Sequence, residues 1–554
     1  MKTAPPAPDR LTMHLFAPGM SPLHRAGLGG LACTLQALED QVRTGLLPAT
    51  ALPAPFQDDR PPWAVTGGAV TLLFGKPEHA GPYLKHLFAF AFAIRPDGLI
   101  SLPGQFETAP PAAVLADVQA GLTLTFLQHG KVRALAKTPT LAAHAPEADG
   151  APGVVVPYRK CGGFKHQRGW EAFIDPGGTL APGPLRVDGP LSPGTVVRHV
   201  AFTGVTAAED PPERMLPLYF APVGCLPLPV NRGVAVLLIP EVDDLTEFVP
   251  DRRALSPATA LECQVAGGAD AALQAQLRLR ARRAARGLDV PGCSAVTFAP
   301  TPWAGQQKSR VATAHAPRAA ADAAVLAWFA RAFRHLPTRI ATRTVRASAG
   351  AGRRGETTER PEAFRANSVV RPLVADNLAA GRPWYAGFAR LMTRTNPATD
   401  APYRAQLPFE RKGLAAMVAD PTMWDHPGER LVVQAVHEAI GRRLGQIGVE
   451  TDGWGAAAVS PAAKARWERF RERLRLALAG AKTEAHVRFA LVDLFSRAGP
   501  NATLQAGGWA AVLPVVRRDW RLARDLGLLA LASYAGRGAD GPPPAPPGPA
   551  ANPE

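Results

Sequence analysis

The pattern of apolar and polar positions changes along the chain. In the first half, short apolar runs separated by Gly and Pro predict strands near residues 11–16, 68–74, 154–156, 234–239 and 295–298. Phe88, Phe90 and Phe92 alternate within residues 86–95, and the Arg-Pro-Asp-Gly sequence that follows predicts a hairpin. From residue 368 onward, apolar positions recur at helical spacing. The sequence therefore predicts an α+β protein: a mixed α/β N-terminal region followed by a C-terminal α-helical bundle.

The first predicted helix, near residues 21–46, has an unusual composition. Ser21 is placed to cap it, with Pro22 at its first position. Gly27, Gly29 and Gly30 lie inside this helix and cost about 1 kcal/mol each relative to Ala. We expect these glycines to allow close backbone approach by another element, or less commonly by a ligand. His14 and His24 are expected to pack or cap near this helix.

The second half predicts a series of capped helices. They lie at residues 320–333, 374–392, 427–447, 461–479 (after Ser460), 483–495 and 519–534. We predict four parts: a near-neutral α/β domain at 1–270, a basic α/β continuation at 271–367, the helical bundle at 368–535, and a disordered Gly/Pro-rich tail at 536–554.

Charge divides the chain near residues 277–286. Residues 1–270 contain 21 Lys and Arg against 24 Asp and Glu, whereas residues 271–554 contain 41 against 22. The excess begins at a predicted helix with Arg278, Arg282 and Arg286 along one ridge and an apolar stripe opposite, formed by Leu273, Leu277, Ala281, Ala284 and Leu288. Two interpretations stay open: a solvated face of a buried helix, or a seam that binds a polyanion.

Residues 158–170 form a concentrated basic segment within the near-neutral half. Four cations and a histidine lie among Tyr158, Phe164, Trp170 and three glycines; they are Arg159, Lys160, Lys165, His166 and Arg168. Cations bind phosphates, aromatic rings stack on bases, and glycines allow close backbone approach. A plain surface hairpin would have a similar sequence, and both interpretations stay open.

Two more Arg-rich windows lie in the basic half. Residues 331–365 hold nine Arg, and Arg353 and Arg354 lie in a Gly-x-Gly-x-x-Gly sequence from Gly350 to Gly355. A dinucleotide site requires an apolar helix after this motif, and a polar segment follows instead. We predict a flexible loop that contacts phosphates or is simply solvated. The helix at 461–479 adds candidate contacts at Arg466, Arg469 and Arg473.

The sequence offers little catalytic chemistry. Its five cysteines include no Cys-x-x-Cys pair, and it has no nucleophile elbow and no Walker A motif. His437-Glu438 is not followed by a second His at 441, so a zincin site is excluded. Acidic residues 241–247 are expected to form a solvated loop.

The N-terminal residues lack a signal-peptide core, and no apolar run is long enough to span a membrane. We therefore predict a cytoplasmic protein that is not an enzyme and has no catalytic residues, metal or cofactor.

Both ends of the chain resemble a known family. The N-terminal Leu-Thr-Met-His-Leu-Phe-Ala-Pro-Gly-Met-Ser-Pro-Leu-His-Arg-Ala-Gly-Leu-Gly-Gly-Leu (11–31) is similar to the start of the large subunit of myxobacterial-type (MYXAN) type I CRISPR systems. Phe-Ala-Leu-Val-Asp-Leu-Phe-Ser-Arg-Ala-Gly (489–499), Asp519-Trp520 and residues 523–534 resemble the end of the same family, also called developmental protein T, among the Cas-eight large subunits. The similarity is weaker over residues 365–388, and the middle of the chain carries no recognisable match.

The resemblance implies a non-enzymatic large subunit of Cascade, the crRNA-guided surveillance complex. The implied partners are crRNA, target double-stranded DNA, the displaced strand, the backbone, crRNA-end-capping and small subunits, and a helicase-nuclease or transposon targeting factors; no membrane is implied. The N-terminal part would recognise the PAM and open the duplex, and the bundle would guide displaced strand and offer the docking surface. In related systems the bundle is also translated separately, and Met392 and Met417 lie where such a start could fall.

Two other functions remain open from the sequence. The first is a CRISPR RNA-processing or DNA-cleaving nuclease subunit that uses a histidine such as His166. The second is a stand-alone DNA-binding regulator, which the basic second half would also suit.

Overall fold

The computed structural model describes residues 8–47, 61–143, 153–191, 193, 207–231, 233–300, 309–316, 323–347, 358–395, 401–454 and 458–536. The chain separates into two compact units, one of residues 1–322 with 363–365, the other of residues 323–362 with 366–554. Mixed helices and strands in the first unit and mostly helices in the second confirm the predicted fold class. The predicted boundaries at 270 and 367 stay predictions, and the tail at 537–554 lies outside the described residues.

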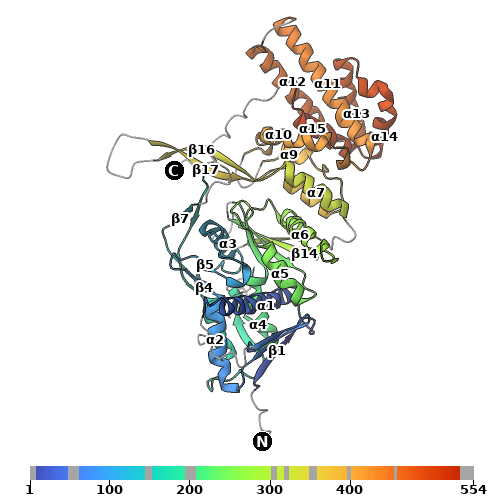
Figure 1. The fold of residues 1–554 in the computed structure, drawn as a ribbon. Coiled ribbons are helices and arrows are strands. Elements are labelled where there is room, and N and C mark those ends of the chain that lie inside the picture. The colour runs from blue at the N-terminus through green and yellow to red at the C-terminus, as the bar shows by residue number, and fades with distance from the viewer. Residues whose placement is uncertain are drawn as a thin grey trace, which may run out of the picture. The chain divides into compact units, whose positions relative to one another are not determined.

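The first unit contains small sheets surrounded by helices (Figure 1). Its helices are α1 Pro22–Arg43, α2 Ala80–Ala91, α3 Ala112–Leu124, α4 Pro212–Gly224, α5 Leu245–Leu255 and α6 Gly268–Ala284. Its strands are β1 Arg10–His14, β2 Trp63–Val65, β3 Ala69–Leu73, β4 Ala93–Ile94, β5 Ile100–Ser101, β6 Arg133–Leu135, β7 Thr140–Ala143, β8 Val155–Tyr158, β9 Cys161–Phe164, β10 Leu185–Asp188, β11 Ala207–Asp210, β12 Leu226–Asn231, β13 Val234–Pro240, β14 Cys293–Pro300 and β15 Ser309–Ala316. The antiparallel sheet β12-β13-β14-β15 is the largest, and β1-β3-β2 is the next.

The glycine-rich helix α1 crosses α4 with their backbones in contact (Figure 1). A Cβ atom on Gly27 or Gly30 would overlap the carbonyl oxygen of Pro217 or Phe220 on α4. On the other helix, a Cβ atom on Gly224 would overlap the carbonyl oxygen of Ala26. This confirms the expected close backbone approach, and the partner is a helix rather than a ligand.

The start of α1 confirms the predicted cap and shows how His24 is used. The Ser21 hydroxyl accepts from the His24 backbone N–H, and the imidazole Nδ1 in turn accepts from the Ser21 backbone N–H at 3.3 Å. The His24 Nε2 atom lies 3.4 Å from Asp210, so Ser21, His24 and Asp210 form a chain of contacts like that of a hydrolase. The Ser21 and His24 side chains, however, each accept a backbone N–H at the first turn of α1. The Ser21–His24 pair is therefore a capping box.

The prediction of a strand at residues 86–95 was wrong over most of its length. Helix α2 extends to Ala91, and only Ala93–Ile94 forms a strand, paired with β5 through the predicted Arg-Pro-Asp-Gly turn. Phe88 and Phe92 are both buried four residues apart, while Phe90 is half-buried. Phe88 and Phe92 lie on one face of the helix. Because Phe at every second position fits both the two-residue period of a strand and the i, i+4 spacing of a helix, the pattern was misinterpreted as a strand.

In its described residues, the second unit consists of helices and one pair of strands (Figure 1). Its elements are α7 Ala323–His335, β16 Arg339–Ala347, β17 Thr358–Ala366, α8 Arg371–Ala379, α9 Ala389–Thr393, α10 Leu407–Ala419, α11 Pro427–Asp452, α12 Pro461–Ala479, α13 Glu484–Ala498, α14 Trp509–Arg518 and α15 Trp520–Ser533. One prediction needs correction: the helix at 374–392 is two helices, separated by a turn in which Gly381 and Gly387 have positive φ. Strands β16 and β17 pair with each other on either side of the predicted Arg353–Arg354 loop, whose residues 350–355 lie outside the described residues.

Buried charges tie distant segments together within each unit. The first unit includes residues 363–365 of β17, and there the Arg365 guanidinium binds the buried Asp117 carboxylate on α3 and also donates to the Ala260 carbonyl. In the second unit, the buried Asp525 carboxylate on α15 accepts the backbone N–H groups of Gly387 and Ala389 at 2.6 and 3.0 Å. Each carboxylate replaces the water that it loses on burial with direct donors.

Candidate nucleic-acid interface

The basic segment 158–170 lies in the second arm, β8 and β9, of an antiparallel hairpin whose first arm is β6 and β7, and it continues into a 3₁₀ turn. Strand β8 pairs with β7, β9 pairs with β6, and residues Lys165–Phe173 form the turn. The backbone N–H of Cys161 donates to Gly98 in the turn of the neighbouring β4–β5 hairpin. The Gln119 side chain donates to the Arg159 carbonyl at 2.6 Å and fixes the hairpin to α3. The loop at 159–160 is therefore held by three surrounding elements.

The cations of this loop project into solvent without ionic partners. Arg159 and Lys160 are exposed, and neither makes an ion pair with any described residue. Lys131 and Lys137, exposed and equally unpaired in the described part of the chain, flank the adjoining strand β6. The Ala136 backbone N–H donates to the Lys160 carbonyl, so β6 and the loop adjoin directly. We call Lys131, Lys137, Arg159 and Lys160 the hairpin cluster.

The glycines beside the hairpin cluster face open space. Gly162 is exposed, and a Cβ atom on it would have no atom closer than 3.9 Å; on Gly163 the nearest would be 3.7 Å away. These two glycines are therefore not required by packing, in contrast to Gly27 and Gly224. Glycine within a strand weakens the strand, and it often marks a place where a ligand approaches the backbone.

Other members of the predicted segment have internal partners. The exposed Arg168 guanidinium forms a two-pronged pair with Glu171, at 2.8 and 3.1 Å. Lys165 is exposed and has a partner within the chain. Among the aromatic residues, Tyr158 donates to the Asp97 carbonyl, Phe164 is buried, and half-buried Trp170 lies against the Lys85 ammonium. Among the cations of this segment, the exposed side chains without a partner among the described residues are therefore Arg159 and Lys160.

His166 is a core residue, so we correct its place among the candidate contacts. Its side chain is 2% exposed, and its ring lies 5.5 Å from that of Phe92 and 5.9 Å from those of Phe164 and Tyr219. Burial lowers the pKa of His166 to about 4, because the apolar surroundings disfavour the imidazolium. A neutral imidazole enclosed by aromatic rings reaches neither a phosphate nor a nuclease substrate.

The arginines of the seam at 277–286 are used inside the first unit. Arg278 donates to the carbonyls of Leu255 and Glu262 at 3.0 Å each, while Arg282 pairs with Asp251 and Arg286 with Glu247. The predicted apolar stripe is also incomplete, since Ala281 and Ala284 are exposed. The ridge therefore fastens α6 to α5 and the segment after it, which favours the structural interpretation.

The other predicted arginines differ in their surroundings. Arg353 and Arg354 lie outside the described residues. On α12, Arg466 pairs with Glu450 at 2.8 Å, whereas Arg469 and Arg473 are exposed and have no carboxylate partner among the described residues. Of the three contacts predicted on α12, Arg469 and Arg473 therefore stay available to a phosphate. They lie one helical turn apart.

A second basic site, which the sequence analysis did not identify, lies where α14 meets α15. The Arg521 and Arg524 guanidiniums lie 4.8 and 5.6 Å from the centre of the half-buried Trp520 ring. Exposed Arg517 lies in the last turn of α14, and the charges of Arg390 and Arg524 both attract the buried Asp525 carboxylate. We call Arg517, Trp520, Arg521 and Arg524 the tryptophan cluster. Its signal was present in the sequence as one Trp within eight residues that include four Arg, residues 517–524.

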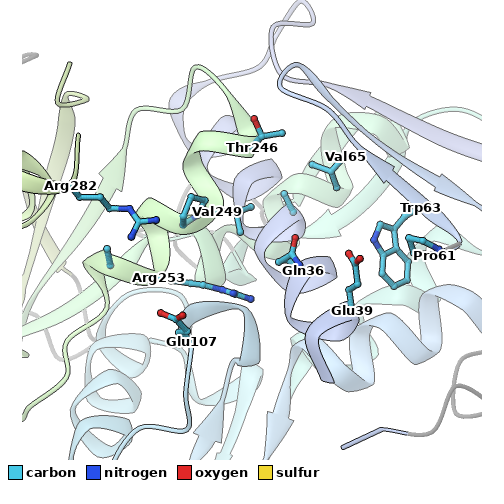
Figure 2. A pocket seen from close by; sticks show the side chains of 13 residues that line it. Gln36, Glu39, Pro61, Trp63, Val65, Glu107, Thr246, Val249, Arg253 and Arg282 are labelled. Atoms are coloured by element: carbon cyan, nitrogen blue, oxygen red, sulfur yellow. The ribbon is translucent and has the colours of Figure 1, made fainter. Parts of the chain in front are cut away.

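A cleft of about 490 Å³ in the first unit has mixed charge (Figure 2). Glu39 and Glu107 line it together with Arg253 and Arg282. Three of these charges have partners: Glu39 binds Arg43, Arg253 binds Asp40 at 2.6 Å, and Arg282 binds Asp251. Because its charges are largely neutralised, this cleft is a poorer phosphate site than the hairpin cluster.

No described helix has the length and apolar character that crossing a membrane requires. Within the described residues, no group of three or more His, Cys, Asp or Glu side chains comes together as a metal site would require. The acidic segment 241–247 is partly structural, since Asp244 caps α5 by accepting from Thr246 and Glu247.

Comparisons with known proteins place both ends of the chain in one group. The family model of the DevT N-terminal domain matches residues 12–219, and that of the DevT C-terminal domain matches residues 420–542. A protein of Myxococcus xanthus (strain DK1622), named CRISPR-associated protein Cas8a1/Csx13, is 35% identical to this chain. The alignment covers 97% of this chain and 90% of that protein.

Proposed function

The chain belongs to the DevT family of CRISPR-associated Cas8 proteins, the large subunits of type I effector complexes, and we propose that it recognises the PAM in double-stranded DNA and promotes duplex opening. In this proposal the large subunit works in the cytoplasm with crRNA and with the backbone, crRNA-end-capping and small subunits. It is non-catalytic, and base pairing with the guide supplies most of the sequence specificity.

The hairpin cluster is the observation that carries this proposal. Its cations are exposed and without carboxylate partners among the described residues, so they are available to neutralise phosphates and release counterions. The open strand at Gly162 and Gly163 gives a duplex close access to the backbone. The loop is held by β6, the β4–β5 turn and α3. Its backbone therefore loses little conformational entropy when its cations bind DNA.

We expect the double substitution Arg159→Ala and Lys160→Ala to weaken binding of the assembled complex to a PAM-containing duplex about tenfold at physiological salt. The slope of log affinity against log salt should fall by about 1.8, as for two lost phosphate contacts. Fluorescence anisotropy of labelled duplexes with and without a PAM, over a salt series, measures both quantities.

The matched control is Arg10→Ala with Lys76→Ala, which removes the same charge from exposed positions near β1 and β3. It should leave duplex binding within about twofold of wild type, because it changes only the screened long-range field. Equal binding by wild type and the hairpin variant, or equal losses in the two double variants, would remove the hairpin cluster from the proposal.

For the bundle we propose that the tryptophan cluster contacts the displaced single strand. Guanidiniums beside an indole combine phosphate attraction with a stacking surface, and this combination suits single-stranded nucleic acid of any sequence. Arg469 and Arg473 would extend the cationic surface on α12. The docking surface for a helicase-nuclease or for transposition factors also belongs to the bundle in this proposal.

Replacing Arg517 and Arg521 by Ala should weaken single-stranded DNA binding by the assembled complex about tenfold, while binding of the PAM duplex stays within twofold. Anisotropy of a labelled oligonucleotide measures the first quantity. As a control, Arg488→Ala with Arg497→Ala removes two exposed arginines of α13 that pair with Glu484 and Asp493. If the control loses as much affinity as the test variant, the cluster has no special role.

A further inference from the structure

Helix α13 turns an apolar stripe toward solvent. Phe489 is 74% exposed and Val492 is 47% exposed, and they lie one turn apart on the same face. Ion pairs on either side, Arg488 with Glu484 and Arg497 with Asp493, make the surroundings polar. Large apolar side chains gathered within a polar rim are typical of a surface that binds another polypeptide.

Next to this stripe is a groove of about 320 Å³ between α13 and the start of α14. It is lined by apolar and polar side chains from both elements and from the turn between them: Val492, Phe495, Ser496, Leu504, Gln505 and Trp509. The Trp509 ring packs edge-on against Phe495, with ring centres 5.7 Å apart, and is 38% exposed. Its indole N–H has no acceptor among the described residues, and the Gln505 side chain is exposed beside it.

This combination of groups fits a polyproline II helix. Such a helix has no internal hydrogen bonds, so its carbonyls are free to accept from an indole N–H or a side-chain amide. Proline-rich segments bind aromatic-lined grooves because they pay little conformational entropy on docking. The chain contains such a segment at residues 541–549, Gly-Pro-Pro-Pro-Ala-Pro-Pro-Gly-Pro, which lies outside the described residues.

The last described residues of α15 lie near one wall of the groove. The Tyr534 ring packs against His437 of α11, and the Asn501 side chain donates to the Ala435 carbonyl of the same helix. Asn501 also lines the groove, and Ala435 and His437 are two residues apart, a rise of about 3 Å along α11. From Gly536 to the first proline of the segment is six residues, which span up to about 20 Å when extended. The segment can therefore reach the groove.

We propose that the proline-rich segment at residues 542–549 docks in the groove between α13 and α14 of its own chain and covers Trp509 and Val492. A tethered segment acts at an effective concentration of about 1 mM, so even weak docking is well populated. This inference needs no nucleic acid and is independent of the proposed PAM and displaced-strand contacts.

The test uses the full chain and a chain that ends at Gly536, with a fluorescent peptide of residues 537–554 as the probe. The peptide should bind the shortened chain saturably and bind the full chain at least about tenfold more weakly, since the tethered segment competes. Hydrogen exchange of peptides covering residues 487–510 should be faster in the shortened chain. A peptide with alanine in place of the prolines should not bind.

Two substitutions in the shortened chain locate the site. Trp509→Phe keeps an aromatic ring against Phe495 but removes the indole N–H, and it should weaken peptide binding about fivefold. Trp454→Phe changes a more exposed tryptophan that lies just after α11, and it should leave binding unchanged. Absence of peptide binding, equal binding of the alanine peptide, or self-association of the shortened chain without peptide binding would each overturn the proposal.

Discussion

Gly224→Ala should destabilise the first unit by about 3 kcal/mol, the upper end of the usual cost of overpacking. A Cβ atom at this position would overlap the backbone carbonyl oxygen of Ala26, and neither helix can move away without opening the contact between α1 and α4. The Gly224 carbonyl also accepts from the buried Arg252 guanidinium, which donates to Val223 and Cys225 as well. A shift of α4 would therefore disturb hydrogen bonds as well as packing.

Urea unfolding followed by hydrogen exchange of peptides from α1 and α4 measures this loss. Gly445→Ala is the matched control, because Gly445 lies in the interior of α11 and a Cβ atom there would meet nothing within 4 Å. That substitution should stabilise α11 by up to about 1 kcal/mol. A loss below about 1 kcal/mol for Gly224→Ala would mean that α1 and α4 separate readily.

His166 should make the stability of the first unit depend on pH. Its pKa of about 4 in the folded chain lies below its ordinary value of 6.5, so the unfolded chain binds the proton more tightly. The contribution is fully present above pH 6.5 and is lost as pH falls toward 4. Over this window the free energy of unfolding should fall by about 3 kcal/mol from this residue.

His166→Phe removes this dependence and keeps the aromatic packing. The Nδ1 atom of His166 has no hydrogen-bond partner among the described residues, so a phenyl ring leaves no donor or acceptor stranded there. Urea midpoints at pH 5 and pH 7.5, compared for wild type and variant, give the difference. The exposed His14, changed to Gln, serves as the control. A wild type and variant with the same pH dependence would contradict the burial of a neutral imidazole.

Local signals in the sequence predicted the elements that local chemistry determines. The caps at Ser21 and Ser460, the prolines after them, and the Arg-Pro-Asp-Gly turn were all confirmed, because each depends on a few neighbouring residues. The strand prediction at 86–95 was wrong because the spacing of Phe88 and Phe92 fits the period of a strand and that of a helix equally well. The single helix predicted at 374–392 failed because Gly381 and Gly387 supply backbone conformations that end helices.

The candidate interface was less predictable, because the availability of a charge depends on tertiary partners. Arg282 and Arg159 look alike in sequence, yet the first binds Asp251 and the second has no carboxylate partner among the described residues. His166 lies within a basic segment but points into a cluster of aromatic rings. The tryptophan cluster was missed because residues 519–534 were interpreted only as a helix of the bundle and Arg517 and Arg521 were not compared with their neighbour Trp520.

The pair of hydrogen bonds that Asp525 accepts bears on where a shorter gene product could begin. A polypeptide initiated at Met392 or Met417 lacks Gly387 and Ala389, so the carboxylate on α15 would lose both of its backbone donors. The DevT C-terminal domain match, which starts at residue 420, omits them as well. A separately translated bundle with the packing described here requires an initiation codon upstream of residue 387.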